Sequence, residues 1–312
     1  MKLVPMLTLP AMFVLLISQS TAAIADPLFG STALLTARDC SNVASTTDCI
    51  GGAAPRVFTS LLGGPSTSLD ATLTNAYGTW SAKTGANPGG LPVLKAGSWS
   101  GNSSRLNTNA VVYQQFTFTG PSHTLFSLVG NLNFDSSGNN GLNGAGQSGQ
   151  GNQGEQAGEA SVFATMYFMD PAAFATVHTA NDVLNLLSQD CSNASVYAYS
   201  GYDNSAPLAS GQQNAQLKLN KNCAGHDMYL NPGDTAVLVL AMQTESNRGG
   251  YADATHSFVT AFDPTLPVET LRVLEQNFIP AAPADIPEPS ALALAAIGLA
   301  GLVRSRKRYG AV

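Results

Sequence analysis

The chain has 312 residues and a formal net charge of -6, and charged side chains make up only 11 % of it. That share is about half of the usual one in globular proteins, so the surface must be polar through Ser, Thr, Asn, Gln and Gly, as exported proteins often are. Residues 26–286 hold 9 Lys+Arg against 19 Asp+Glu. An acidic body without a basic stripe argues against nucleic-acid binding.

The first 25 residues have the three parts of a secretory signal peptide. Lys2 is the positive end, residues 6–17 form an apolar run, and Ala23-Ile24-Ala25 is a small-x-small cleavage site. The apolar run is short for a membrane span. We therefore predict a mature protein that starts at Asp26, and the alternative is an uncleaved N-terminal anchor.

Export changes how the four cysteines are interpreted, because an even number in an oxidising compartment favours disulfides. The cysteines allow three pairings, and local pairing as Cys40–Cys49 and Cys191–Cys223 fits the spacing best. The competing interpretation is a metal site, but His226 is the only histidine close to a cysteine and no C-x-x-C occurs. Structural zinc needs four ligands, so we expect neither a metal nor a cofactor.

Residues 26–55 are expected to be loop-rich and to pack on the rest of the domain. The sequence from residue 56 to 278 mostly predicts strands, separated by turns rich in Gly, Pro and Asn. Residues 111–120 are rich in β-branched and aromatic side chains, and residues 122–134 follow after a Gly-Pro turn. Together these two segments predict an antiparallel hairpin.

Further strands are predicted along the second half of the chain. Residues 214–222 alternate strictly, with Ala215, Leu217 and Leu219 on one face, as in a half-exposed strand. Residues 234–244 are continuously apolar and predict a central strand. The other strand candidates are residues 160–170, 194–203 and 254–264.

Two segments break the strand pattern. Residues 170–189 begin with Asp-Pro and repeat apolar residues near helical spacing, which predicts one or two helical turns across an end of a sheet. Residues 263–278 fit a strand or a short helix. The chain is therefore predicted to be all-β over residues 26–280, as an antiparallel, jelly-roll-like β-sandwich with one short helix.

Residues 135–160 are Gly-rich and nearly free of apolar side chains, so they have little to bury and predict a long loop. A calcium loop would need a nonapeptide repeat, which is absent. Glu155 and Glu159 could be paired as the acid and base of a glycosidase. Such a pair needs a rigid frame, which a Gly/Asn/Gln segment does not provide.

No nucleophile, zincin, P-loop or dinucleotide motif occurs, so no catalytic residue is assigned. The four histidines are interpreted as surface or structural residues: His123, His178, His226 and His256. Six aromatic residues could instead form a sugar-stacking face, although aromatics in strands are more often core residues. They are Trp80, Trp99, Tyr113, Tyr197, Tyr199 and Tyr202.

The C-terminal end has three consecutive parts after a Pro/Ala linker at residues 281–286. Residues 290–303 are uncharged and rich in Ala and Leu, and as a helix they would reach about 21 Å against about 30 Å of hydrocarbon. This predicts a marginal transmembrane helix. The basic cluster that follows is expected to stay cytoplasmic; its residues are Arg304, Arg306, Lys307 and Arg308.

With Pro287-Glu288-Pro289 ahead of this helix, the tail over residues 287–312 resembles the PEP-CTERM sorting domain of Gram-negative bacteria. The resemblance implies recognition and cleavage near the motif by an exosortase, a membrane cysteine-type transpeptidase or protease. It also implies a transient inner-membrane anchor, followed by delivery to the cell surface or outside the cell. Glu288 and its prolines would then be substrate features.

These observations predict an exported, non-enzymatic protein of the cell surface or extracellular matrix, linked to exopolysaccharide or biofilm through the resemblance of its tail. The alternative is a carbohydrate-binding module that acts on matrix polysaccharide. A secreted hydrolase is a third possibility and would need convergent carboxylates or a Ser/His pair in a cleft.

Overall fold

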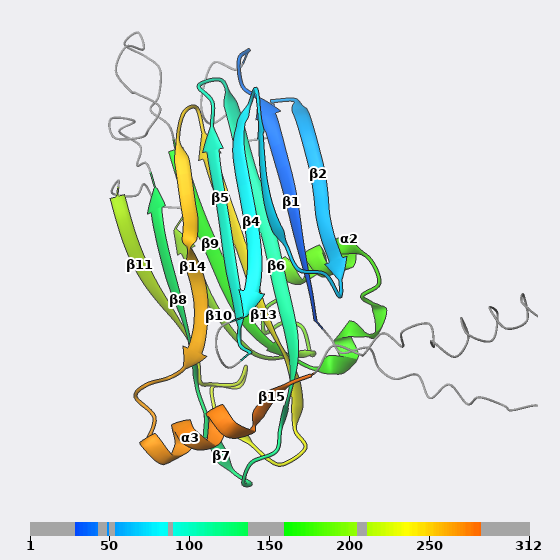
Figure 1. Cartoon of the computed structure of the whole chain (residues 1–312), viewed down its shortest axis with the longest axis vertical. Coiled ribbons are helices and arrows are strands. Elements are labelled where there is room, and N and C mark those ends of the chain that lie inside the picture. The colour runs from blue at the N-terminus through cyan, green and yellow to red at the C-terminus, as the bar shows by residue number, and fades with distance from the viewer. Residues whose placement is uncertain are drawn as a thin grey trace, which may run out of the picture.

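The computed structural model describes residues 29–42, 49, 54–86, 90–136, 159–204 and 211–281. Two antiparallel sheets lie face to face in these residues (Figure 1). The antiparallel β-sandwich that the strand pattern predicts is therefore confirmed. The jelly-roll form of that architecture stays a prediction.

The first sheet has the order β10-β9-β13-β6-β1-β2, with β15 beside the end of β6. Its strands are β1 (Phe29–Asp39), β2 (Arg56–Pro65), β6 (Ser104–Phe118), β9 (Glu159–Met169), β10 (Val196–Asn204), β13 (Thr235–Asn247) and β15 (Phe278–Pro280). The second sheet has the order β11-β8-β14-β5-β4-β3. Its strands are β3 (Asp70–Asn75), β4 (Gly78–Ala86), β5 (Pro92–Ser100), β8 (Leu128–Ser136), β11 (Gly211–Leu219) and β14 (Tyr251–Phe262).

The main core fills the space between the sheets because each strand turns its alternate apolar side chains inward. Trp80 of β4 is completely buried there, and its indole N–H donates across the sandwich to the carbonyl of Thr36 in β1 (3.1 Å). In β11 the inward side chains include Leu217 and Leu219. This agrees with the alternation that predicts that strand.

The segment before residue 56 is not loop-rich as expected, because β1 is a long strand between β2 and β6. Its inward side chains Ala33, Leu35 and Ala37 are buried in the main core. Their spacing of two residues is a strand signal. The strand ends beside the disulfide Cys40–Cys49, which is present as predicted.

The predicted hairpin of residues 111–120 and 122–134 is wrong. The first segment lies in β6, and the second lies in β7 (Thr124–Phe126) and β8, which belong to other sheets. One edge of β6 is occupied by β1 and β15 and the other by β13. No edge of β6 is left for β8, so the chain leaves the sheet after Phe118. It first pairs with β12 (Met228–Leu230) and then enters the second sheet.

The helical segment predicted at residues 170–189 is confirmed, but it covers a face of the first sheet and not an end. It comprises η1 (Pro171–Thr176), α2 (Ala180–Leu184) and η2 (Asn185–Ser188). Outward side chains of the central strands, such as Tyr113 and Val239, pack under it in a second cluster with Val183. The central strands are thus buried on both faces, which explains the continuous apolar run in β13.

The ambiguous segment at residues 263–278 forms α3 (Val268–Asn277), followed directly by β15. Figure 1 shows α3 at one end of the sandwich, beside β7, and α2 next to β1 and β2. In the part of the chain that the structure describes, no helix is long and apolar enough to cross a membrane. The predicted signal peptide and the predicted transmembrane helix at residues 290–303 lie outside that part.

Candidate functional site

The predicted sorting motif, Pro287-Glu288-Pro289, and the basic cluster at residues 304–308 lie outside the described residues. The described part of the domain ends at Ala281, close to them in the sequence. The backbone N–H of Ala281 donates to the carbonyl of Gln115 in β6 (2.9 Å), and five residues of sequence separate Ala281 from Pro287. β15, the last strand among the described residues, is therefore fixed to the sandwich.

The six candidate sugar-stacking aromatics do not form one face. Trp80 is buried between the sheets and Tyr113 is buried under α2, while Tyr202 packs against the main core. Tyr197 and Tyr199 of β10 are about 40 % exposed. The interpretation of strand aromatics as core residues therefore holds for Trp80 and Tyr113, and the alternative of one face built from all six rings is not supported.

A pocket of about 670 Å³ lies where β10, β12, the start of β13 and β15 meet. Its apolar floor includes Phe168 and Phe278, whose rings belong to a phenylalanine cluster at this end of the core. The polar lining comes from three separate segments of the chain: Tyr197, Asn222, Asp227, Tyr229, Asp234 and Thr235. We call this cavity the Tyr197–Tyr229 pocket.

Residues 222–224 and 227–228 line one side of the Tyr197–Tyr229 pocket, and the loop that carries them is held in place at several points. The disulfide Cys191–Cys223, present as predicted, ties the loop to the segment after η2. The N–H of Cys223 donates to the carbonyl of Tyr197 (2.8 Å). Asn222 Oδ1 accepts from the N–H groups of Ala224 and His226 (both 3.0 Å). The wall is therefore preorganised before any ligand arrives.

The rim of the Tyr197–Tyr229 pocket is negatively charged. Asp227 and Asp234 carry carboxylates, and no Lys or Arg is among the described residues that line the cavity. Burial raises the pKa of Tyr197, and its hydrogen bond with Asp170 and the charges of Asp170 and Asp234 raise it further. Lys221, just outside, pairs with Asp227 (3.2 Å).

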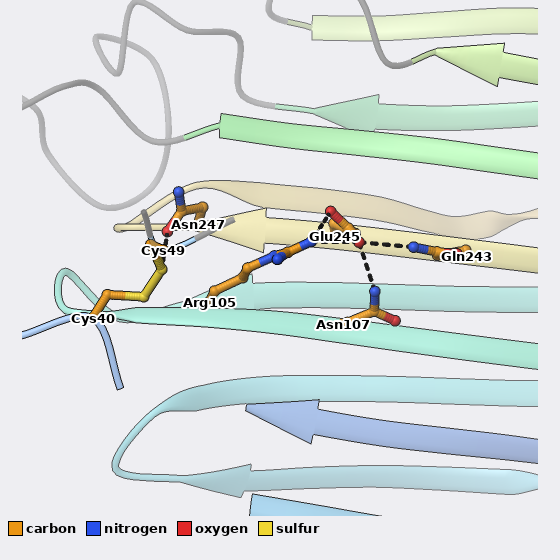
Figure 2. A network of polar contacts seen from close by, with 7 residues as sticks. All are labelled: Cys40, Cys49, Arg105, Asn107, Gln243, Glu245 and Asn247. Carbon is orange, nitrogen blue, oxygen red and sulfur yellow. Dashed lines mark hydrogen bonds and ion pairs between the residues drawn. A yellow bond between two sulfur atoms is a disulfide. The ribbon is translucent and has the colours of Figure 1, made fainter. Parts of the chain in front are cut away.

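A second polar cluster lies on the outer side of β6 and β13 (Figure 2). Glu245 accepts two bonds from Arg105 Nη2 (2.8 and 2.7 Å), one from Asn107 Nδ2 (2.7 Å) and one from Gln243 Nε2 (2.7 Å). The Arg105 and Glu245 side chains are only 13 % and 19 % exposed. With its acceptor sites engaged in this way, the carboxylate is suited to a structural role.

Asp263, directly after β14, is a buried carboxylate with several partners. Its side chain is 3 % exposed and lies 2.5 Å from Lys218 Nζ, and it accepts from the Ser127 and Thr265 hydroxyls (2.9 and 2.7 Å). Burial by itself opposes ionisation, but these contacts outweigh it and hold the pKa of Asp263 well below its ordinary value.

The remaining candidates are spread over the chain. His123, His178 and His226 are exposed, as predicted for surface residues. The described residues contain no group of three or more His, Cys, Asp or Glu side chains that could hold a metal. Glu155 lies outside the described residues and Glu159 begins β9, so the paired-acid hypothesis stays untested.

The described residues thus form a β-sandwich with two disulfides, and a family comparison identifies the segment that follows it in the sequence. Residues 285–308 match the model of the PEP-CTERM protein-sorting motif. The chain therefore carries a PEP-CTERM sorting signal at its C-terminal tail, as the resemblance predicts. The motif implies export, a membrane-associated sorting step and exosortase-mediated processing.

Comparison with solved structures adds little to this assignment. The structure of TmCBM61 in complex with β-1,4-galactotriose is similar over 59 % of this chain and 88 % of that chain, with 6 % sequence identity and a TM-score of 0.24. A TM-score this low supports no conclusion about the fold or the ligand of this chain. No curated protein matches the sequence.

Proposed function

We propose that the chain is an exported, non-enzymatic protein of the cell surface or extracellular matrix, processed by an exosortase and associated with exopolysaccharide or biofilm. The PEP-CTERM motif at residues 285–308 carries this proposal. The motif follows directly on a β-sandwich with two disulfides, and such bonds persist in oxidising compartments.

The delivery route follows from the order of the sequence elements. The predicted signal peptide at residues 1–25 is removed, and the helix predicted at residues 290–303 holds the exported domain at the inner membrane. The basic cluster at residues 304–308 keeps the end of the helix on the cytoplasmic side. Cleavage near Pro287 then releases the domain toward the cell surface.

The non-enzymatic role is supported by the partners that already engage the carboxylates of Glu245 and Asp263. Glu245 is engaged by Arg105 and two amides, and Asp263 is engaged by Lys218 and two hydroxyls. A general acid or base needs a free position facing its substrate. Both residues are instead used to bind strands together.

Expression of the full chain in a host with and without an exosortase tests the sorting step. We expect the enzyme to remove the tail from the natural chain, so that mass spectrometry finds a mature protein lacking the helix at residues 290–303. Glu288→Ala should prevent this removal. Glu275→Ala, an exposed glutamate on α3, is the matched control and should be processed normally. A tail that stays attached in both hosts would refute the proposal.

Carbohydrate binding is the second candidate function. The observation that favours it is the Tyr197–Tyr229 pocket, which combines two exposed tyrosines with carboxylate and amide groups over an apolar floor. Pockets of this size and mixed lining are where small ligands usually bind.

A further inference from the structure

We propose that the Tyr197–Tyr229 pocket binds an uncharged sugar unit of a neutral polysaccharide. This inference rests on the proposed role as an exported, carbohydrate-associated protein and names the site and the ligand class. Four properties of the pocket support it: the two aromatic rings, the hydrogen-bonding groups between them, the sign of the charge and the rigidity of the walls.

The two rim tyrosines present ring surface where a ligand can reach it. Tyr197 is 39 % exposed and Tyr229 is 42 % exposed. His123 stacks on Tyr229 with ring centroids 3.9 Å apart and planes at 3°, so one face of the Tyr229 ring is covered and the ring is held in orientation. The C–H groups of a pyranose ring are weakly positive and suit the negative face of an aromatic ring.

The polar groups of the pocket match hydroxyl groups, which both donate and accept hydrogen bonds. The carboxylates of Asp227 and Asp234 are acceptors. Asn222 already uses Oδ1 to bind two backbone N–H groups, which leaves its Nδ2 group as a donor. A polyol can satisfy both kinds of group at once, whereas an apolar ligand would leave them unsatisfied.

The charge of the rim selects against acidic sugars. Two carboxylates line the pocket, and no cation stands among its described lining residues. The nearby ammonium of Lys221 is already paired with Asp227. A uronate would therefore meet the Asp234 carboxylate and an Asp227 carboxylate whose charge Lys221 only partly offsets, with no cation in the described lining to pair with it, which costs binding energy. A neutral hexose unit avoids this repulsion.

The walls of the pocket are fixed before binding, so little ordering entropy is lost when the ligand enters. Cys191–Cys223 and the bond from Cys223 to Tyr197 hold one wall. The turn at residues 231–234 holds another: the N–H of Asn231 donates to Asp234 Oδ2 (2.7 Å) and the N–H of Gly233 donates to the carbonyl of Phe118 (2.8 Å). Gly233 has a positive φ of 90°, which the turn requires.

The test uses the full chain purified in a detergent without sugar groups. A glycan array of neutral gluco-, manno-, galacto- and xylo-oligosaccharides is compared with polygalacturonate and alginate fragments, and hits are measured by calorimetry. We expect binding to at least one neutral series and none to the acidic fragments. Tyr229→Ala and Asp234→Asn should each weaken binding about tenfold or more, as expected for central contact residues.

Two control variants show whether the glycan binds in the Tyr197–Tyr229 pocket or elsewhere on the domain. Tyr199→Ala removes an equally exposed tyrosine of β10 that lies outside the pocket, and it should leave the affinity unchanged. Asn131→Ala with Gln216→Ala alters the amide-lined groove on the second sheet and should also have no effect. Absence of binding to every neutral glycan, preference for acidic ones, or loss of binding only in the groove variant would overturn the proposal. None of these outcomes bears on tail cleavage, which has its own readout.

Discussion

The partly buried pair of Arg105 and Glu245 allows a quantitative prediction about stability. Replacing Glu245 by Gln removes the carboxylate that faces the Arg105 guanidinium, which is 13 % exposed. Replacing Arg105 by Met leaves the Glu245 carboxylate with only its two amide donors. Breaking such a pair from one side costs about 3–5 kcal/mol, and the residual exposure here places each single variant near the lower value, about 3 kcal/mol.

The double variant isolates the free energy of interaction between Arg105 and Glu245 from the contributions of their other neighbours. Once both charges are absent, no uncompensated charge remains, so we expect Arg105→Met with Glu245→Gln to cost no more than either single change. The coupling free energy is then about 3 kcal/mol. Equilibrium unfolding in urea measures all four proteins, at low and high salt. Additive single effects, or single effects below about 1 kcal/mol that vanish in salt, would show an ordinary surface ion pair and refute the reasoning.

Three further predictions concern a buried carboxylate, a disulfide and two buried tyrosines. Because the folded pKa of Asp263 lies below its unfolded value of about 4, its stabilising effect is present above pH 4 and is lost as the pH falls through the folded pKa. Asp263→Asn should therefore cost most at neutral pH and progressively less in acid unfolding series. Replacing Cys191 and Cys223 by Ser opens a link of 32 residues and should lower the unfolding free energy by about 4 kcal/mol; an unchanged urea midpoint would contradict this. Burial raises the pKa of Tyr113 and Tyr167 to about 12, so absorbance titration should show these two phenols ionising well after the exposed tyrosines.

Local sequence signals predict the individual strands well. The alternation in residues 214–222 corresponds to β11, and the continuous apolar run at residues 234–244 corresponds to central β13. Both patterns follow directly from which faces of a strand are buried. The disulfides Cys40–Cys49 and Cys191–Cys223 are likewise predicted from short sequence separation.

Pairing between strands is harder to predict because it depends on competition among distant segments. Residues 111–120 and 122–134 look like a hairpin locally, but β1, β13 and β15 take both edges of β6. The position of β1 inside the first sheet has the same origin. Its neighbour β6 is more than 60 residues away in sequence, and no local pattern specifies that contact.

The Tyr197–Tyr229 pocket is equally hard to predict from sequence, because its residues come from distant segments. Tyr197 is among the aromatics singled out from the sequence, but Tyr229 lies in the three-residue strand β12, which is too short for a strand pattern. Asp234 belongs to a turn whose Asn-Pro-Gly-Asp sequence indicates its shape and not its neighbours. Only the closure of this end of the sandwich brings these side chains together.

The proposed glycan site and the proposed exosortase cleavage site lie near each other along the chain. Phe278 contributes to the pocket floor and is the first residue of β15, the last strand before the tail. Nine residues lead from Phe278 to Pro287, a chain length of about 30 Å when extended. A glycan bound in the pocket would thus be held close to the point where the exosortase acts. Shortening the linker at residues 282–286 brings the cleavage motif closer to the folded sandwich, so we expect it to impair tail cleavage. Glycan affinity should stay unchanged, because Ala281 keeps its bond to β6. Equal loss of tail cleavage and of glycan binding would argue that the tail supports the pocket itself.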